Sequence, residues 1–229
     1  MNRYFITGTD TDAGKTLAAT ALLARARRQG LSTLGLKPVA AGCERLPEGL
    51  RNADALALQA LSHPAVDYAT VNPITLEPPI APHLAAARAG ETLRLARLRD
   101  AMARALVEPR DLVLIEGAGG WRVPLNDDED LSGLAVALGL PVILVVGLQL
   151  GCINHARLTQ EAILADGLII AGWIASQVDP DMAEPEANLA TLRAYLHAPC
   201  LGVIPWLEDD GGHSPLAERA AAYLDLPGD

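Results

Sequence analysis

The sequence contains 229 residues, carries a formal net charge of −10, and is 50% hydrophobic and 20% charged. This length fits one large domain with its own core, so we expect a single domain over residues 1–229. The acidic balance argues against binding to nucleic acid or to an anionic membrane surface, since both need basic patches. Three scattered cysteines, no signal-peptide pattern and no long uncharged apolar run predict a reduced, cytoplasmic protein.

Short apolar runs alternate with helical patterns along the chain. We expect strands at residues 4–7, 33–36, 111–115, 142–146, 168–174 and 201–204. Helices are expected at about residues 14–28, 154–164, 184–196 and 215–224. Apolar strands separated by helices are typical of a mostly parallel sheet with helices on both faces, so the predicted fold class is α/β.

Residues 43–90 are less regular and rich in proline. We interpret them as an excursion packed on the same domain. Long irregular segments inside compact domains are usually functional. We therefore expect this one to contribute to a site.

A glycine-rich loop, residues 8–16, lies between the first strand and the first helix and reads Gly-Thr-Asp-Thr-Asp-Ala-Gly-Lys-Thr. In such loops backbone N–H groups surround phosphate oxygens, the lysine reaches the β- and γ-phosphates, and the following hydroxyl ligates Mg²⁺. Gly8 stands one residue further from Gly14 than in the standard pattern, so the loop is a variant. A plain tight turn would leave Lys15 unexplained, because a cation opposes the helix dipole there. We therefore expect a nucleoside triphosphate and Mg²⁺ on a P-loop NTPase-type domain.

The chain contains only two lysines, Lys15 and Lys37, and the rest of its 18 basic residues are arginines. Lys37 ends the second predicted strand. An ammonium group there can neutralise charge on a transferred phosphoryl group or hold an acidic substrate. The plainer alternative is a strand-edge lysine that extends to solvent.

Two carboxylates are candidates for the metal. Glu116 follows a buried strand and precedes Gly-Ala-Gly-Gly, which places it beside the phosphate loop, although a turn or helix-capping role remains the plainer alternative. Asp54 lies two residues after Asn52, a favourable N-cap. As a first-turn acid it could complement the helix dipole as easily as it could bind a metal.

Taken in order, these motifs resemble the dethiobiotin synthetase family. The resemblance covers nearly the whole chain, through residues 8–16, 37–39, 48–54, 82–83, 116–120, 151–155, 171–173 and 204–206. It implies ATP-dependent closure of a cyclic urea on 7,8-diaminononanoate with CO₂ or bicarbonate, a step of biotin synthesis. The implied course runs through a carbamate and a carbamic-phosphoric mixed anhydride, with Mg²⁺ as cofactor and no protein nucleophile.

The resemblance also implies roles for residues at matching positions. Lys15 and Lys37 would be catalytic. The ATP residues would be Asp12, Ala13, Gly14, Lys15, Thr16, Ser176, Pro205 and Trp206; the Mg²⁺ ligands Thr16, Asp54 and Glu116; and the diamine residues Thr11, Lys37 and Ala41. A helix start would receive the substrate carboxylate from the partner subunit, which predicts a homodimer with shared active sites. Its residues are Gly151, Cys152, Ile153 and Asn154.

Four positions depart from the family pattern. Asp12, Ala41 and Gln149 stand where glutamate, serine and lysine are common, and we expect weaker diamine binding from them without loss of catalysis. Ser176 stands where an asparagine usually reads adenine. A single hydroxyl cannot reproduce the paired donor and acceptor of an amide, so selectivity for adenine does not follow from this residue.

Three other functions remain open on the sequence alone. A regulatory P-loop ATPase of the partitioning type would need a DNA- or membrane-binding surface, yet residues 215–224 do not form a basic amphipathic helix. A signalling GTPase is disfavoured because residues 176–179, Ser-Gln-Val-Asp, lack the Asn and Lys of a guanine motif. A related amidoligase is disfavoured by Lys37 and by residues 151–154.

Overall fold

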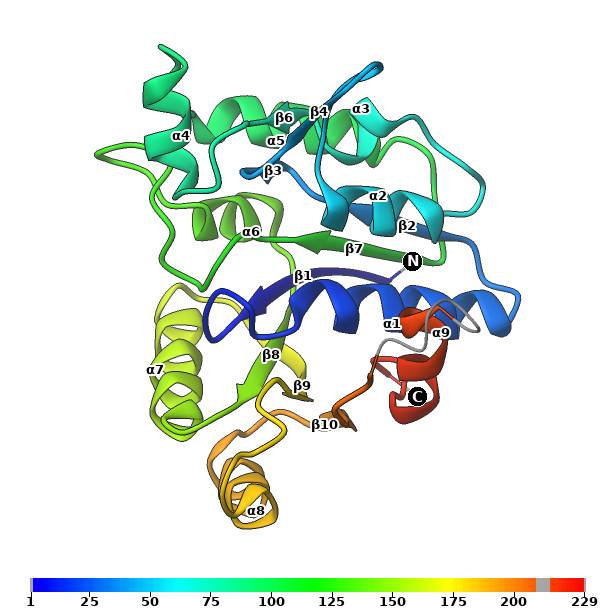
Figure 1. Ribbon diagram of the computed structural model, residues 1–229, viewed down its shortest axis with the longest axis vertical. Helices are drawn as coiled ribbons and strands as arrows, with labels where there is room; N and C mark the ends of the chain where they lie inside the picture. The colour runs from blue at the N-terminus through cyan, green and yellow to red at the C-terminus, as the bar shows by residue number, and fades with distance from the viewer. Residues whose placement is uncertain (1, 209–214, 229) are drawn as a thin grey trace.

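A computed structural model describes residues 2–208 and 215–228. Its main element is a six-stranded sheet in the order β10-β9-β8-β1-β7-β2, and each neighbouring pair is parallel. Figure 1 shows this sheet running through the middle of the molecule. The strands are β1 (Asn2–Gly8), β2 (Thr33–Leu36), β7 (Leu112–Glu116), β8 (Val142–Leu148), β9 (Ile170–Gln177) and β10 (Cys200–Ile204). The predicted α/β fold class is confirmed.

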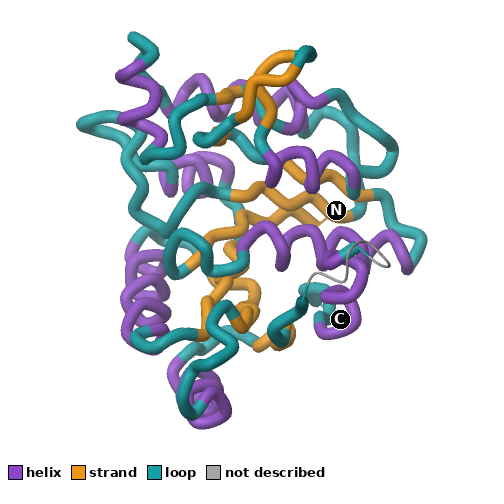
Figure 2. Tube along the Cα trace, in the orientation of Figure 1, coloured by secondary structure: helices purple, strands orange, loops and turns teal. Residues whose placement is uncertain are grey.

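Helices cover both faces of the sheet (Figure 2). Alternate side chains of one strand point to opposite faces, so Phe5 and Ile6 of β1 belong to different hydrophobic clusters. The Phe5 cluster includes α5 (Leu95–Ala105) and α6 (Ser132–Leu138), and the Ile6 cluster includes α1 (Lys15–Arg28) and α2 (Ala53–Ala60). Helices α7 (Cys152–Ala165) and α8 (Pro185–Tyr195) pack against β8 and β9. Burial on both faces explains the uninterrupted apolar strands.

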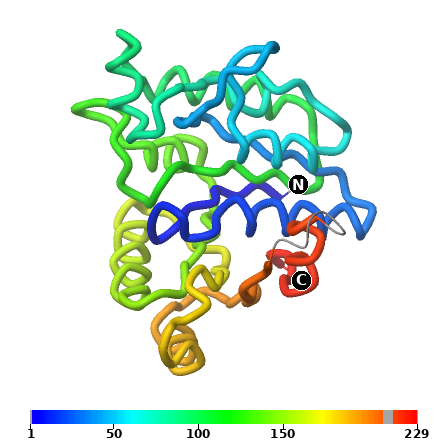
Figure 3. The backbone as a smooth tube through the Cα atoms, viewed as in Figure 1, coloured from blue at the N-terminus to red at the C-terminus, as the bar shows by residue number. Residues whose placement is uncertain are grey.

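The predicted strands and helices are confirmed, with ends that differ by a few residues. The last predicted helix is shorter than expected. It consists of α9 (Leu216–Ala220) and a single 3₁₀ turn (Ala221–Tyr223). This C-terminal segment lies beside α1 (Figure 3), where Arg28 and Glu218 form an ion pair at 2.6 Å.

The prediction for residues 43–90 was wrong about their regularity. They contain a hairpin of β4 (Glu44–Leu46) and β5 (Gly49–Arg51), then α2, α3 (Tyr68–Val71), β6 (Ile74–Thr75) and α4 (Pro82–Arg88). Strand β6 pairs with β3 (Val39–Ala40). Helices α5 and α6 were not predicted either. Apart from α5, which has 11 residues, these are short elements that gain their stability from packing, which local sequence does not reveal.

The strand order places three loop starts at one edge of the sheet. Strand β1 lies beside β7, and β7 lies beside β2. Ile6 pairs with Glu116, and Leu36 pairs with Ile115. The phosphate loop, Glu116 and Lys37 therefore leave the sheet together at its carboxyl edge, where α/β sheets bind ligands.

Candidate active site

The phosphate loop folds tightly between β1 and α1. A Cβ on Gly8 would lie 2.9 Å from the carbonyl oxygen of Asp10 and 3.1 Å from Lys15 Nζ. Gly14 has a φ of 86°, a left-handed conformation that favours glycine, and it directly precedes the helix. Lys15 Nζ donates a hydrogen bond of 2.8 Å to the carbonyl oxygen of Asp10. The loop thus holds an ammonium group at a helix N-terminus, which is an anion-binding arrangement.

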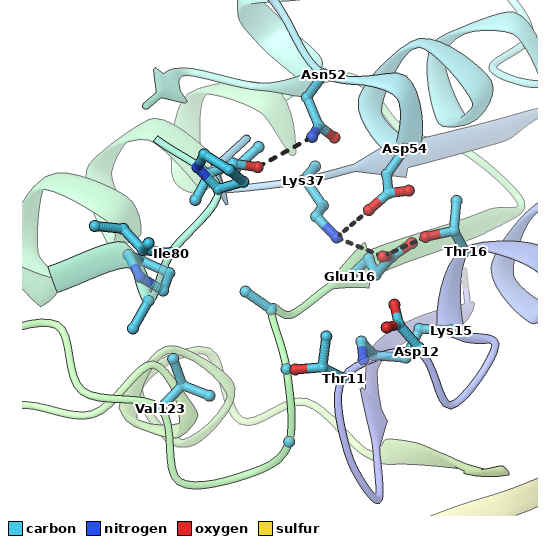
Figure 4. A pocket seen from close by; sticks show the side chains of 18 of the residues that line it. Thr11, Asp12, Lys15, Thr16, Lys37, Asn52, Asp54, Ile80, Glu116 and Val123 are labelled. Atoms are coloured by element: carbon cyan, nitrogen blue, oxygen red, sulfur yellow. Dashed lines mark hydrogen bonds and ion pairs between the residues drawn. The ribbon is translucent and has the colours of Figure 1, made fainter. Parts of the chain in front are cut away.

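Four polar side chains meet beside this loop (Figure 4). Lys37 Nζ lies 2.5 Å from Glu116 Oε1 and 3.1 Å from Asp54 Oδ2. The hydroxyl of Thr16 donates a hydrogen bond of 2.8 Å to the same Glu116 oxygen. Glu116 is fully buried and Lys37 is 5% exposed, whereas the Asp54 side chain is 43% exposed. The structure therefore brings together the second lysine and the three predicted metal ligands.

The charges in this cluster shift the pKa values of Lys37 and of the neighbouring Lys15. Burial by itself would lower the pKa of Lys37, but the charges and hydrogen bonds of Glu116 and Asp54 outweigh burial and raise that pKa. Burial lowers the pKa of Lys15, and the neighbouring charge of Lys37 lowers it further. Lys37 is therefore held as an ammonium by carboxylates, whereas an anion bound at Lys15 would restore the preference of Lys15 for its charged form.

The oxygen atoms of the cluster fit Mg²⁺. Glu116 Oε2 is buried and has no hydrogen-bond partner among the described residues. The Thr16 hydroxyl and the Asp54 carboxylate lie on the same cluster. Nowhere in residues 2–208 and 215–228, this cluster included, could a group of three or more His, Cys, Asp or Glu side chains hold a metal ion. Mg²⁺ usually takes one or two carboxylates and fills its other positions with water and phosphate oxygens, as this sparse set would allow.

A cavity of about 860 Å³ opens above the cluster. Its far wall includes Ala118, Gly119 and Gly120 from the loop after β7, and Pro79 and Ile80 from the segment before α4. Most of the predicted site residues line it, namely Thr11, Asp12, Gly14, Lys15, Thr16, Lys37, Ala41, Asp54 and Glu116. Its size suits a small ligand bound against the phosphate loop.

The residues predicted to face the nucleotide base lie outside this lining. Ser176 is the second-last residue of β9 and is 3% exposed, and a Cβ on Gly14 would approach its hydroxyl oxygen to 2.4 Å. Ser176 therefore packs directly against the last glycine of the phosphate loop. Pro205 and Trp206 follow the neighbouring strand β10, and Trp206 is 48% exposed. Ala13 is buried, with Gly147 of β8 behind it.

The start of α7 is separate from the cavity. Gly151 has a φ of 99° and caps the helix, Cys152 is buried in the core, and Leu150 is 94% exposed. A second hollow of about 490 Å³ lies here, lined partly by Gly151, Ile153 and Asn154. None of its lining residues lines the larger cavity. The predicted residues Gly151, Ile153 and Asn154 therefore do not line the cavity at the phosphate loop of their own chain.

Sequence reasoning missed the residues that hold Lys37 in place. Asn72 is buried, and its Nδ2 donates to the carbonyl oxygen of Lys37 at 2.7 Å. The Tyr68 hydroxyl donates to Asn72 Oδ1 at 2.9 Å and accepts from the Asn52 backbone N–H at 2.8 Å. Asn52 is also the predicted N-cap of α2, accepting from the Ala55 N–H. Only this capping role has a local sequence signal.

The fold and the phosphate loop define a nucleotide-binding α/β domain of the P-loop class. The profile of the AAA domain family matches residues 2–214. Among solved structures, the MinC:MinD cell division complex of Aquifex aeolicus matches with a TM-score of 0.57 at 15% identity, covering 99% of this chain and 87% of that one. Likeness at this level of identity shows the fold alone.

Curated relatives are far more similar. The ATP-dependent dethiobiotin synthetase BioD of Chromohalobacter salexigens is 62% identical, with 100% of both chains covered. The protein of the same name from Cellvibrio japonicus is 57% identical, covering 97% of this chain and 95% of that one. The chain belongs to the dethiobiotin synthetase family.

No helix in the described residues is long and apolar enough to cross a membrane.

Proposed function

We propose that this chain is an ATP-dependent dethiobiotin synthetase that closes a cyclic urea on 7,8-diaminononanoate with CO₂, using Mg²⁺ and ATP. Residues 1–229 would act as one nucleotide-binding and catalytic domain in the cytoplasm. The observation that carries the proposal is the position of Lys37, a buried ammonium bound to Glu116 and Asp54 beside the phosphate loop. This places a second cation next to the phosphate-binding lysine, as transfer to an anionic carbamate needs.

The phosphate loop would bind the triphosphate. Its backbone N–H groups and Lys15 would hold the β- and γ-phosphates, which displaces Lys15 Nζ from the Asp10 carbonyl oxygen. Thr16, Asp54 and Glu116 would hold Mg²⁺, which when bound supplies charge neutralisation on the phosphates. The ammonium groups and backbone donors contribute positioning and electrostatic stabilisation, the two main needs of phosphoryl transfer.

Lys37 would hold the carbamate. In the proposed course one substrate amine attacks CO₂ and loses a proton, giving a carbamate whose oxygen attacks the γ-phosphorus as ADP leaves. The second amine then attacks the carbamate carbon and loses a proton, inorganic phosphate leaves, and the ring closes. The ammonium of Lys37 would orient the carbamate oxygen and stabilise the charge that develops during transfer. Thr11 and Ala41 line the same cavity and would face the diamine.

The start of α7 would bind the carboxylate of a substrate molecule that occupies the active site of a partner subunit. A helix N-terminus attracts carboxylates, and Gly151 and Asn154 present this one at the surface. Exposed leucines flank it, since Leu150 is 94% and Leu158 is 56% exposed. A face of this kind would be covered in a homodimer with shared active sites.

The proposal is tested by phosphate release from MgATP, with and without diaminononanoate and bicarbonate, together with mass spectrometry of the product. We expect release to depend on both additions and to match dethiobiotin formed. In Lys37→Gln we expect product formation to fall at least about 100-fold while ATP binding is largely kept.

Three outcomes would contradict this proposal in whole or in part. Release stimulated by DNA or lipid vesicles, but not by the diamine, would favour a regulatory ATPase of the partitioning type. Release that needs a carboxylic-acid substrate and an external amine would favour a related amidoligase. Unchanged turnover in Lys37→Gln would remove Lys37 from the mechanism.

A further inference from the structure

The glycine loop, residues 117–120, forms one wall of the larger cavity. It begins directly after Glu116, and its Gly-Ala-Gly-Gly sequence gives it three residues without side chains. A Cβ on Gly119 would lie 3.5 Å from the Thr11 hydroxyl, and one on Gly120 would lie 3.6 Å from the Thr9 carbonyl oxygen. The loop therefore runs along the phosphate loop. Glycine has the most conformational freedom to lose on folding, so the course of this loop depends on how its ends are held.

Both ends of the glycine loop are anchored. At the first end the Gly117 N–H donates to the carbonyl oxygen of Ile6 at 2.9 Å. At the second end Trp121 is 4% exposed, and its ring meets Phe5 edge-on with 6.0 Å between ring centroids. The indole Nε1–H of Trp121 donates to Asp166 Oδ2 at 2.8 Å. The second anchor thus depends on a residue 45 positions further along the chain.

Asp166 receives two hydrogen bonds from consecutive residues. Besides Trp121, Arg122 Nη2 donates to Asp166 Oδ1 at 2.8 Å. Partial burial by itself would raise the pKa of Asp166, but the hydrogen bonds from Arg122 and Trp121 and the Arg122 charge lower it. The carboxylate is therefore ionised at neutral pH. Each of its two oxygens holds one residue of the segment that follows the glycine loop.

The position of Asp166 in its own helix does not explain why an aspartate stands there. Asp166 is the C-cap of α7, where the negative end of the helix dipole disfavours a carboxylate. Its contacts lie instead on the segment after the glycine loop. The hydrogen bonds of the carboxylate to that segment offset its unfavourable interaction with the helix dipole.

We propose that Asp166 is a positioning residue for the reaction, which holds the glycine loop against Thr11 and the phosphate loop through Trp121 and Arg122. Its kinetic consequence rests on the proposed function. The loop lies on the Thr11 side of the cavity, whereas Ser176 lies outside its lining. Loss of the anchor should therefore affect the diamine more than ATP.

The first experiment compares Asp166→Asn with wild type and with Asp111→Asn in steady-state kinetics. Asp111 is a matched control, because it also accepts two hydrogen bonds, from the Ser32 N–H and hydroxyl, but precedes β7 at the opposite edge of the sheet. We expect kcat/KM for the diamine to fall about 10- to 100-fold in Asp166→Asn, the usual range for a residue behind a binding group. The KM for ATP should change less than about twofold, and Asp111→Asn should match wild type in both parameters.

A double-mutant cycle with Trp121→Phe tests the route. If Asp166 acts through Trp121, the double variant should lose little more kcat/KM for the diamine than the worse single variant. Asp166→Glu, which keeps the charge, should recover part of the loss. Additive losses, wild-type kinetics in Asp166→Asn, or an equal loss in Asp111→Asn would each overturn the inference.

Hydrogen exchange measures the anchor independently of activity. Amides of residues 117–122 should exchange at least about 10-fold faster in Asp166→Asn than in wild type, because local opening sets exchange rates. In Asp111→Asn the exchange rates of these amides should equal those of wild type. Unaltered exchange in this segment would overturn the positioning role even if the enzyme were active. Wild-type protein that makes no dethiobiotin, but shows the faster exchange in Asp166→Asn, would contradict the proposed function and leave the anchor standing.

Discussion

The two regions that we propose for the active site are built differently. At the chemical end, Lys15, Lys37 and Glu116 are buried, and Glu116 contacts both Lys37 and Thr16 directly. At the recognition end, formed by residues 150–154 at the start of α7 and by residues 205–206 after β10, several side chains face solvent. Leu150 is 94% exposed and Trp206 is 48% exposed.

This difference distinguishes the part of the proposed site that one chain forms by itself from the part that a ligand or a second subunit would cover. The chemical end is fixed by adjacent strand ends, so its geometry follows from the fold. The recognition end has apolar and polar groups that a nucleotide base or a second subunit would cover. We therefore expect changes at the chemical end to act on rate and stability, and changes at the recognition end to act on affinity.

The largest effect should come from Glu116→Ala. Glu116 is fully buried and contacts both Lys37 and Thr16, so its removal leaves Lys37 with only the half-exposed Asp54. Breaking a buried ion pair costs about 3–5 kcal/mol, and we expect about 3 kcal/mol here because Asp54 remains. Turnover should fall more than about 100-fold with the loss of this proposed metal ligand. Urea unfolding and product formation measure the two effects.

Glu218→Ala is the control for that variant. Glu218 also forms an ion pair, with Arg28, but both side chains are at least 36% exposed. Exposed pairs contribute about 0–1 kcal/mol, so unfolding and turnover should stay close to wild type. Equal destabilisation in the two variants would mean that the chemical end is no more tightly built than the surface.

Much of the chemical end could be predicted from the sequence. Apolar strands followed by Gly8, Lys37 and Glu116 indicated three polar strand ends, and a parallel sheet brings such ends together. The N-cap role of Asn52 was also predicted and is confirmed, since its side chain accepts from the Ala55 N–H. These features depend on local pattern and on strand order, which the sequence reports well.

The supporting contacts could not be predicted in the same way. Asn72 bonds to the Lys37 carbonyl across 35 positions, and Asp166 bonds to Trp121 across 45. In the sequence, neither Asn72 nor Asp166 has a spacing or a neighbouring composition that distinguishes it from a polar residue on the surface. Helix α5 was missed although Leu98 and Met102 lie one turn apart on its buried side. Its arginine-rich exposed side and apolar buried side form the pattern of an amphipathic helix, so this element did have a local sequence signal.

The next effect should come from Leu158→Arg, one turn of α7 beyond the recognition end. Leu158 lies on α7, is 56% exposed and lines the second hollow. If α7 meets a partner subunit, a buried unpaired arginine should dissociate the dimer and raise the KM for diaminononanoate at least about 10-fold. Sedimentation and steady-state kinetics measure the two. Val107→Arg, at a residue 76% exposed after α5, should change neither, and a dimer that survives Leu158→Arg would place the interface elsewhere.

A smaller effect should follow from Lys37→Met when metal affinity is measured without nucleotide. Lys37 neutralises Glu116 and Asp54, the same carboxylates proposed to hold Mg²⁺. Without this ammonium the two carboxylates should attract a divalent cation more strongly. We expect the Kd for Mn²⁺, followed by electron paramagnetic resonance, to fall about 10-fold, or about 1.4 kcal/mol. Weaker Mn²⁺ binding would show that Lys37 supports the metal site rather than competing for it.

The smallest effect concerns Ser176, which lies against Gly14 of the phosphate loop. Its hydroxyl packs against Gly14 and could offer the base one hydrogen bond, whereas an asparagine amide offers a donor and an acceptor together. One hydrogen bond contributes about 0.5–1.5 kcal/mol, so wild type should prefer ATP over GTP or CTP by no more than about 10-fold in kcat/KM. Ser176→Asn should raise that preference by a similar factor, and Ser176→Ala should lower it. A wild-type preference near 1,000-fold, unchanged in Ser176→Ala, would mean that backbone groups and not Ser176 select the base, and the recognition end would then be as complete in one chain as the chemical end.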